Sequence, residues 1–122
     1  MKATDTGIKR ILKAFVYSRD GFLSAFKSEA ALRQDLAVFA IFSIVAMCLN
    51  LVLWQKAVLI SSLLFIVIME LVNTAVEVVI DRISPEYHEL SKKAKDIGSL
   101  LVLLAFVNAV ILWGAFLYPQ FF

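Results

Sequence analysis

The chain of 122 residues has little cysteine, proline, glycine or charge. Its one cysteine, Cys48, excludes a disulfide within the chain, and its one histidine excludes a zinc site built from Cys and His pairs. No glycine-rich phosphate loop and no protein-kinase signature occurs. Charged residues make up only 18% and hydrophobic residues 61% of the chain, which argues against a soluble domain, a disordered chain and a nucleic-acid binder. The composition therefore predicts an integral membrane protein.

Three long apolar runs carry this prediction. Residues 36–55 include no charge, and as a helix they would cover about 30 Å, the hydrocarbon thickness of a bilayer. Residues 97–118 also lack charge, and residues 57–80 are as apolar but contain Glu70 and Glu77. We expect an all-α membrane protein with three transmembrane helices, forming a single membrane domain over residues 1–122.

The residues before the first run have a different pattern. In the arm of residues 1–35, apolar side chains recur at helical spacing, with basic residues between them. This is typical of an amphipathic helix that lies along a membrane surface. The apolar positions are Ile8, Ile11, Leu12, Phe15, Phe22 and Phe26.

The distribution of basic residues predicts the orientation. Seven lie before the first run and four lie in residues 81–96, whereas Lys56 alone lies between the first two runs. By the positive-inside rule, the arm and the loop of residues 81–96 are cytoplasmic. The C-terminus is then expected on the other side of the membrane.

The middle run contains a stripe of polar residues. On an ideal helix, Glu70, Asn73, Thr74, Glu77 and Asp81 fall within about 100° of one another. Lipid cannot solvate such a face, so it should point into protein or a wet cleft. The stripe is a candidate site, although such groups can also hold helices together by hydrogen bonds.

The two carboxylates of the stripe suggest two roles. Glu70 and Glu77 lie about 10 Å apart along the helix, too far to share a proton. Glu77 lies near the cytoplasmic boundary, where a carboxylate can hold a divalent cation. Glu70 lies deeper, where low-dielectric surroundings suit a general base near neutral pH. Lys95 and Arg10 are candidates for phosphate contact, whereas His88 by itself is more typical of a surface residue.

A different class of function also puts acidic residues in membrane helices. A small proton or cation pathway, or an accessory membrane subunit, would have this feature. A pathway needs ionisable groups through its depth, however, and residues 57–69 offer only Ser61 and Ser62 as polar groups. We therefore favour an enzyme.

Several segments give the sequence a family resemblance. The run ELVNTAVEVVIDRI at residues 70–83, EYHELS at 86–91 and AKDIGS at 94–99 resemble the signature of the bacterial integral-membrane diacylglycerol kinases. The similarity extends upstream through residues 10–14, 17–18 and 29–34. It implies a homotrimer in the bacterial inner membrane that transfers the γ-phosphate of MgATP to the primary hydroxyl of 1,2-diacylglycerol, giving phosphatidic acid. Kinases of polyprenols such as undecaprenol share the acidic helix and the Lys-Asp pair, and they are the alternative.

The resemblance also implies roles for particular residues. Glu70 and Asn73 match catalytic positions, Glu70 as the base, and Glu29 and Glu77 match carboxylates that hold Mg²⁺. Nucleotide-contacting positions are matched by Arg10, Tyr17, Glu29, Glu77, Glu86, His88, Lys95 and Asp96. Lipid-binding positions are matched by Arg10, Ala14, Ala31, Leu32, Arg33, Gln34, Asp35, Lys56, Glu70, Ser99 and Trp113.

Overall fold

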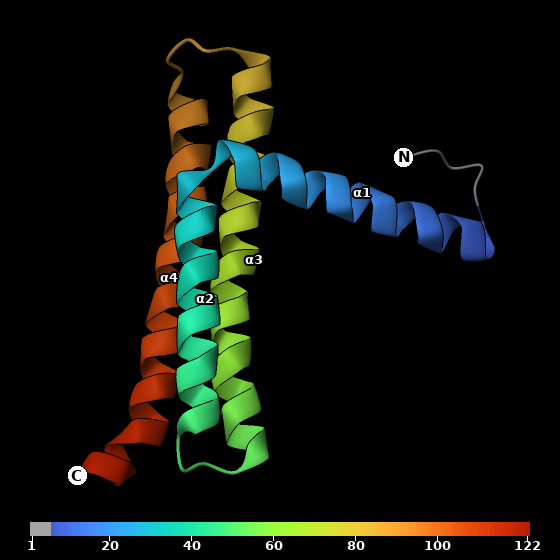
Figure 1. Cartoon of the computed structure of the whole chain (residues 1–122). Coiled ribbons are helices and arrows are strands. Elements are labelled where there is room, and N and C mark those ends of the chain that lie inside the picture. The colour runs from blue at the N-terminus through green and yellow to red at the C-terminus, as the bar shows by residue number, and fades with distance from the viewer. Residues whose placement is uncertain (1–5) are drawn as a thin grey trace.

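The computed structural model describes residues 6–122 as four helices (Figure 1). They are α1 (Gly7–Ser28), α2 (Ala30–Cys48), α3 (Leu53–Ile83) and α4 (Glu89–Phe121). No strand occurs among these described residues, and α2, α3 and α4 are each long and apolar enough to cross a membrane. The all-α class with an N-terminal helix and three spans is therefore confirmed, while residues 1–5 of the expected arm lie outside the described residues.

The three long helices lie side by side, and α3 packs against both α2 and α4. Between α3 and α4 the core consists of Leu63, Ile66, Ala105 and Ala109, where the two alanines allow the helices to approach closely. Most other large apolar side chains are exposed, as Val110 and Ile111 illustrate. An exposed apolar surface of this extent needs lipid or another protein around it.

The helix boundaries differ from those expected from charge. Residues 30–35, expected in the surface arm, begin α2, and much of the expected loop of residues 81–96 is helical. Only residues 84–88 connect α3 to α4, and the His88 Nδ1 accepts a hydrogen bond from the Leu90 N–H at 3.0 Å as the N-cap of α4. Charge marks where a helix leaves the hydrocarbon, whereas caps and turns mark where it ends.

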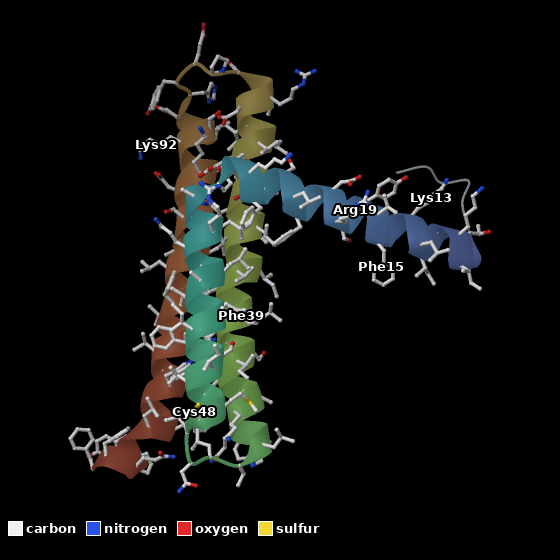
Figure 2. The ribbon with its side chains drawn as sticks, in the orientation of Figure 1. Lys13, Phe15, Arg19, Phe39, Cys48 and Lys92 are labelled. Carbon is white, nitrogen blue, oxygen red and sulfur yellow. The ribbon has the colours of Figure 1, made fainter. Side chains whose placement is uncertain are left out.

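Helix α1 leaves the bundle at the start of α2 and runs away from it, roughly across the direction of the other helices (Figure 1). In Figure 2, Phe15 points to the side of α1 on which α2 lies, and Lys13 points to the opposite side. This is the arrangement of a surface helix with its apolar face in the bilayer. Helices α3 and α4 continue past the level of α1 before they meet at their connection.

Arg33 holds the corner between α1 and α2. Its Nη1 donates to the carbonyl oxygens of Phe26 at 2.5 Å and Lys27 at 3.2 Å. These carbonyl groups belong to the last turn of α1, where no following turn of the helix supplies N–H donors for them. The side chain of Arg33 therefore fixes the direction in which α1 leaves the bundle.

Candidate active site

The polar stripe of α3 is buried at one end and open at the other. Glu70 and Thr74 are each 7% exposed, and Asn73 and Glu77 are half-buried. Asp81 is exposed, with 64% of its side-chain surface open. The stripe therefore faces neighbouring helices rather than lipid, and it opens toward the α3–α4 connection.

Helix α2 covers the buried end of the stripe. Asp35, in the second turn of α2, is 9% exposed, and its side chain lies near the Glu70 carboxyl group. Asn73 lies beside Glu70, and its Nδ2 donates a hydrogen bond to Glu77 Oε1 at 3.4 Å. Asn73 thus lies between the deep carboxyl group and the shallow one, and it bonds to the shallow one.

Helix α4 closes the other side of the stripe through a glycine. Gly98 is buried, and a Cβ at this position would overlap Asn73 Oδ1. That oxygen is enclosed and has no hydrogen-bond donor among residues 6–122. Gly98 therefore leaves the space that the Asn73 amide occupies. Sequence reasoning missed this role, although an isolated glycine in an apolar helix is a signal of close helix approach.

The open end of the site lies around the α3–α4 connection. A groove of about 440 Å³ is lined there by Glu86, His88, Lys95 and Asp96, all of which match nucleotide-contacting positions. Lys95 Nζ also pairs with Asp81 Oδ1 at 2.9 Å, which joins α4 to the open end of the stripe. The structure thus brings together four of the residues expected to contact the nucleotide.

The remaining nucleotide-contacting positions lie elsewhere in the chain. Arg10 and Tyr17 are exposed on α1, whose N-terminal part lies far from the bundle (Figure 1). Glu29 lies between α1 and α2, where it is half-buried. Within one chain, Arg10 therefore does not lie near the groove at residues 84–96.

The residues expected to bind lipid are spread along the whole bundle. Near the α1–α2 corner, Leu32 is fully buried, Arg33 is held by backbone carbonyls and Asp35 faces Glu70. Ala31 and Gln34 are exposed there, as are Ala14 on α1 and Ser99 on α4.

Two members of this set lie toward the α2–α3 connection. Lys56 Nζ donates to the Met47 carbonyl oxygen at 2.7 Å, and Trp113 Nε1 donates to Ser62 Oγ at 3.2 Å. Trp113 also borders an apolar groove of about 480 Å³. Ser62 is about 12 Å from Glu70 along α3, so Trp113 is too distant to touch a group that reacts at Glu70.

The acidic residues of the site do not form a metal cage of their own. Among residues 6–122, no group of three or more acidic, histidine or cysteine side chains lies together in a way that could hold a metal ion. Mg²⁺ is usually bound by one or two carboxylates together with substrate phosphates and waters. The hard oxygen donors of Glu29 and Glu77 fit an ion that arrives with a nucleotide better than one held by protein alone.

Comparison with known proteins agrees with the resemblance seen in the sequence. The family model described as prokaryotic diacylglycerol kinase matches residues 16–117. A diacylglycerol kinase of Escherichia coli K12 is 42% identical over 121 residues, which cover 99% of both chains. One from Pseudomonas aeruginosa is 42% identical over 112 residues, covering 92% of this chain and 91% of that protein. One from Helicobacter pylori J99 is 36% identical over 117 residues, covering 95% and 91%.

Proposed function

The chain belongs to the prokaryotic diacylglycerol kinase family, and on that premise we propose that its reaction takes place at the polar stripe of α3. It is an ATP-dependent lipid kinase that acts on diacylglycerol. The observation that supports this location best is the burial of Glu70 inside a membrane helix whose polar face opens at Asp81. A lipid substrate can reach such a face from the bilayer, and a water-soluble substrate can reach it from the open end.

Glu70 is the general base of the proposed mechanism. Its carboxylate takes the proton from the primary hydroxyl of 1,2-diacylglycerol, and the hydroxyl oxygen attacks the γ-phosphorus of ATP. The bond between the γ-phosphorus and the bridging oxygen breaks, and ADP and phosphatidic acid are the products. Asn73 lies beside Glu70 and would position its carboxylate.

The nucleotide binds from the cytoplasmic side in this proposal. Glu86, His88, Lys95 and Asp96 line the groove at the open end of the stripe, and the ammonium group of Lys95 would contact phosphate oxygens. Arg10 and Tyr17 would complete the site. Glu29 and Glu77 would hold the Mg²⁺ that accompanies ATP, which when bound neutralises charge on the phosphates.

The lipid reaches Glu70 from within the bilayer. Ala14 lies on α1, residues 31–35 begin α2 and Ser99 lies in the N-terminal half of α4. We place the glycerol headgroup among them. The apolar groove beside Trp113 extends toward the opposite end of the bundle and would accommodate an acyl chain. Lys56 would lie at the far end of that acyl chain. The separation of Trp113 from Glu70 suits a substrate with a long apolar tail.

The site requires more than one copy of the chain. Arg10 lies on the part of α1 that is distant from the groove, and a neighbouring copy would bring an equivalent residue to it. We therefore propose a homotrimer in the bacterial inner membrane, with α1 and the α3–α4 connection on the cytoplasmic side and the C-terminus in the periplasm. This orientation follows the distribution of basic residues.

Phosphate transfer by the purified protein in mixed micelles tests the proposed function. Labelled γ-phosphate from ATP should appear in phosphatidic acid when 1,2-diacylglycerol is present, and transfer to undecaprenol should be at least about tenfold slower, which corresponds to about 1.4 kcal/mol of transition-state discrimination. A micelle without either alcohol is the control. Faster transfer to undecaprenol would assign the chain to polyprenol phosphorylation instead.

A further inference from the structure

Asp81 is the last polar residue of the stripe on α3, and the proposed mechanism gives it no role. Its Oδ1 lies 2.9 Å from Lys95 Nζ on α4, and the pair joins two helices that are separated by the connection of residues 84–88. Within residues 6–122, the lining of the groove proposed for the nucleotide includes Lys95 but not Asp81. Asp81 is therefore in a position to act on the groove through Lys95.

The backbone around the groove is held by local hydrogen bonds. The Glu86 N–H donates to Ser84 Oγ at 3.1 Å, and the His88 side chain caps α4. Lys95 reaches the groove on a flexible aliphatic stem, so its ammonium group needs a contact of its own to stay in one place. Asp81 supplies that contact from the neighbouring helix.

Another lysine of the groove, Lys92, is held differently. Its Nζ pairs with Asp96 Oδ2 at 2.6 Å, one turn further along the same helix. That pair keeps Lys92 along the surface of α4, whereas the pair with Asp81 draws Lys95 toward α3. Asp81 lies one turn beyond Glu77, about 6 Å along the helix axis. The ammonium group of Lys95 is therefore held at the same end of the stripe as the carboxylate that we propose for Mg²⁺.

We propose that Asp81 is a positioning residue for Lys95: its carboxylate holds the ammonium group at the open end of the stripe, where the phosphates of MgATP would bind. This inference rests on the proposed function, because it assumes that Lys95 contacts phosphate oxygens. A lysine ammonium group has several N–H donors, and the contact with one Asp81 oxygen leaves others for phosphate. The Lys95 side chain is then already ordered when the nucleotide arrives, and binding does not have to order it.

The charge of Asp81 and its contact with Lys95 predict opposite effects when the carboxylate is removed. A carboxylate repels an anionic ligand, so by Coulomb's law its loss alone would strengthen the binding of MgATP. Loss of the contact would release the Lys95 side chain, and the nucleotide would then have to order it, which weakens binding. The pair is exposed, with 43% of the Lys95 and 64% of the Asp81 side-chain surface open, so its contribution to folding stability is small. The sign of the change in MgATP binding can therefore be measured in a folded protein.

Substitutions of Asp81 test the proposed positioning. Asp81→Asn removes the charge and keeps the shape of the side chain, and it should raise the KM and the Kd for MgATP by about 3- to 5-fold. The kcat and the KM for diacylglycerol should each change by less than about twofold. Asp81→Glu keeps a carboxylate within reach of the flexible lysine and should restore most of the lost affinity. Asp20→Asn is the matched control, because Asp20 forms a similarly exposed ion pair with Arg19 on α1, at 3.2 Å, and this variant should bind MgATP as the wild type does.

Removal of Lys95 shows whether Asp81 acts through it. Lys95→Met keeps the apolar stem without the charge and should raise the KM for MgATP by about tenfold or more, because a charged contact with phosphate is lost. In the Lys95→Met background, Asp81→Asn should cause no further rise, because the group that Asp81 positions is absent. Helix content and thermal unfolding of each variant identify the folded ones, and Asp81→Ala replaces Asp81→Asn if asparagine prevents folding.

Each other outcome contradicts the inference. An unchanged or lower Kd for MgATP in Asp81→Asn would show that Asp81 contributes only its charge. Additive losses in the double variant would show that Asp81 acts on the nucleotide without Lys95, and an equal loss in Asp20→Asn would show that the pair at Asp81 has no special place. If Lys95→Met binds MgATP as well as the wild type does, the proposed nucleotide site is wrong. A weakened Lys95→Met beside a normal Asp81→Asn would overturn this inference alone.

Discussion

At the scale of single residues, the polar stripe was predictable and its partners were not. A period of 100° per residue puts Glu70, Asn73, Thr74 and Glu77 on one face, and the structure buries or half-buries all four. Asp35 and Gly98 complete the surroundings from α2 and α4. Their positions depend on the register and rotation of helices packed on each other, which runs of similar apolar residues do not encode.

Gly98→Ala tests whether the space around Asn73 matters for catalysis. The added Cβ would overlap Asn73 Oδ1 and push the amide away from Glu70 and Glu77. We expect kcat to fall by about tenfold or more, and the free energy of unfolding to fall by about 1–3 kcal/mol because a well-packed contact becomes overfilled. Kinetics in micelles and thermal unfolding measure the two effects.

Gly114→Ala is the matched control for this substitution. Gly114 lies on the same helix, and a Cβ there would meet no atom within 4 Å. Since alanine favours a helix by about 1 kcal/mol relative to glycine, this variant should be as active as the wild type and no less stable. Equal effects of the two substitutions would show that the close approach at Gly98 has no special role.

At the scale of elements, charge predicted which segments cross the membrane but not where helices end. The expected loop of residues 81–96 contains eight charged residues, yet Asp81 belongs to α3 and Lys92, Lys95 and Asp96 belong to α4. Helices continue beyond the bilayer because their hydrogen bonds are internal and water solvates their charged side chains. This extension forms the groove around residues 84–88 that we propose for the nucleotide.

Depth measurements on α1 test its position at the membrane surface. Spin labels are attached to Phe15→Cys or Lys13→Cys in a Cys48→Ala background, because Cys48 is exposed and would also be labelled. The two side chains point to opposite sides of α1 (Figure 2). The label at position 15 should be relaxed mainly by oxygen dissolved in lipid, and the label at position 13 mainly by a water-soluble nickel complex. The same accessibility at both positions would contradict a helix that lies in the interface.

At the scale of the whole molecule, one chain does not bring Arg10 to the groove that we propose for the nucleotide. The helix class, the three spans and the surface helix could be predicted from hydrophobic length and periodicity. The arrangement of α1 could not, because its direction depends on the α1–α2 corner, where Arg33 binds the last carbonyls of α1. That direction takes Arg10 away from the groove lined by Lys95. The proposed homotrimer explains how both residues could contact one nucleotide.

Mixing of inactive subunits tests a site shared between copies. Glu29→Gln and Glu70→Gln chains are purified separately, then combined in equal amounts and reassembled from denaturing detergent. If a site takes Glu29 from one copy and Glu70 from the next, random mixing should restore about one quarter of the sites. Phosphate transfer by the mixture, compared with each variant alone, gives the result. A mixture that stays inactive while reassembled wild-type protein regains activity would place both residues of each site in one chain.

The most direct test of the account is γ-phosphate transfer to diacylglycerol by Glu70→Gln, measured together with MgATP binding. Glutamine keeps the size of the side chain but cannot accept the hydroxyl proton. We predict that kcat falls by at least about 10²–10⁴-fold while the Kd for MgATP changes by less than about twofold. Glu77→Gln should instead weaken MgATP binding and raise the Mg²⁺ requirement. A Glu70→Gln enzyme with near-normal kcat, or one whose defect matches that of Glu77→Gln, would contradict the assignment of the buried carboxylate as the base.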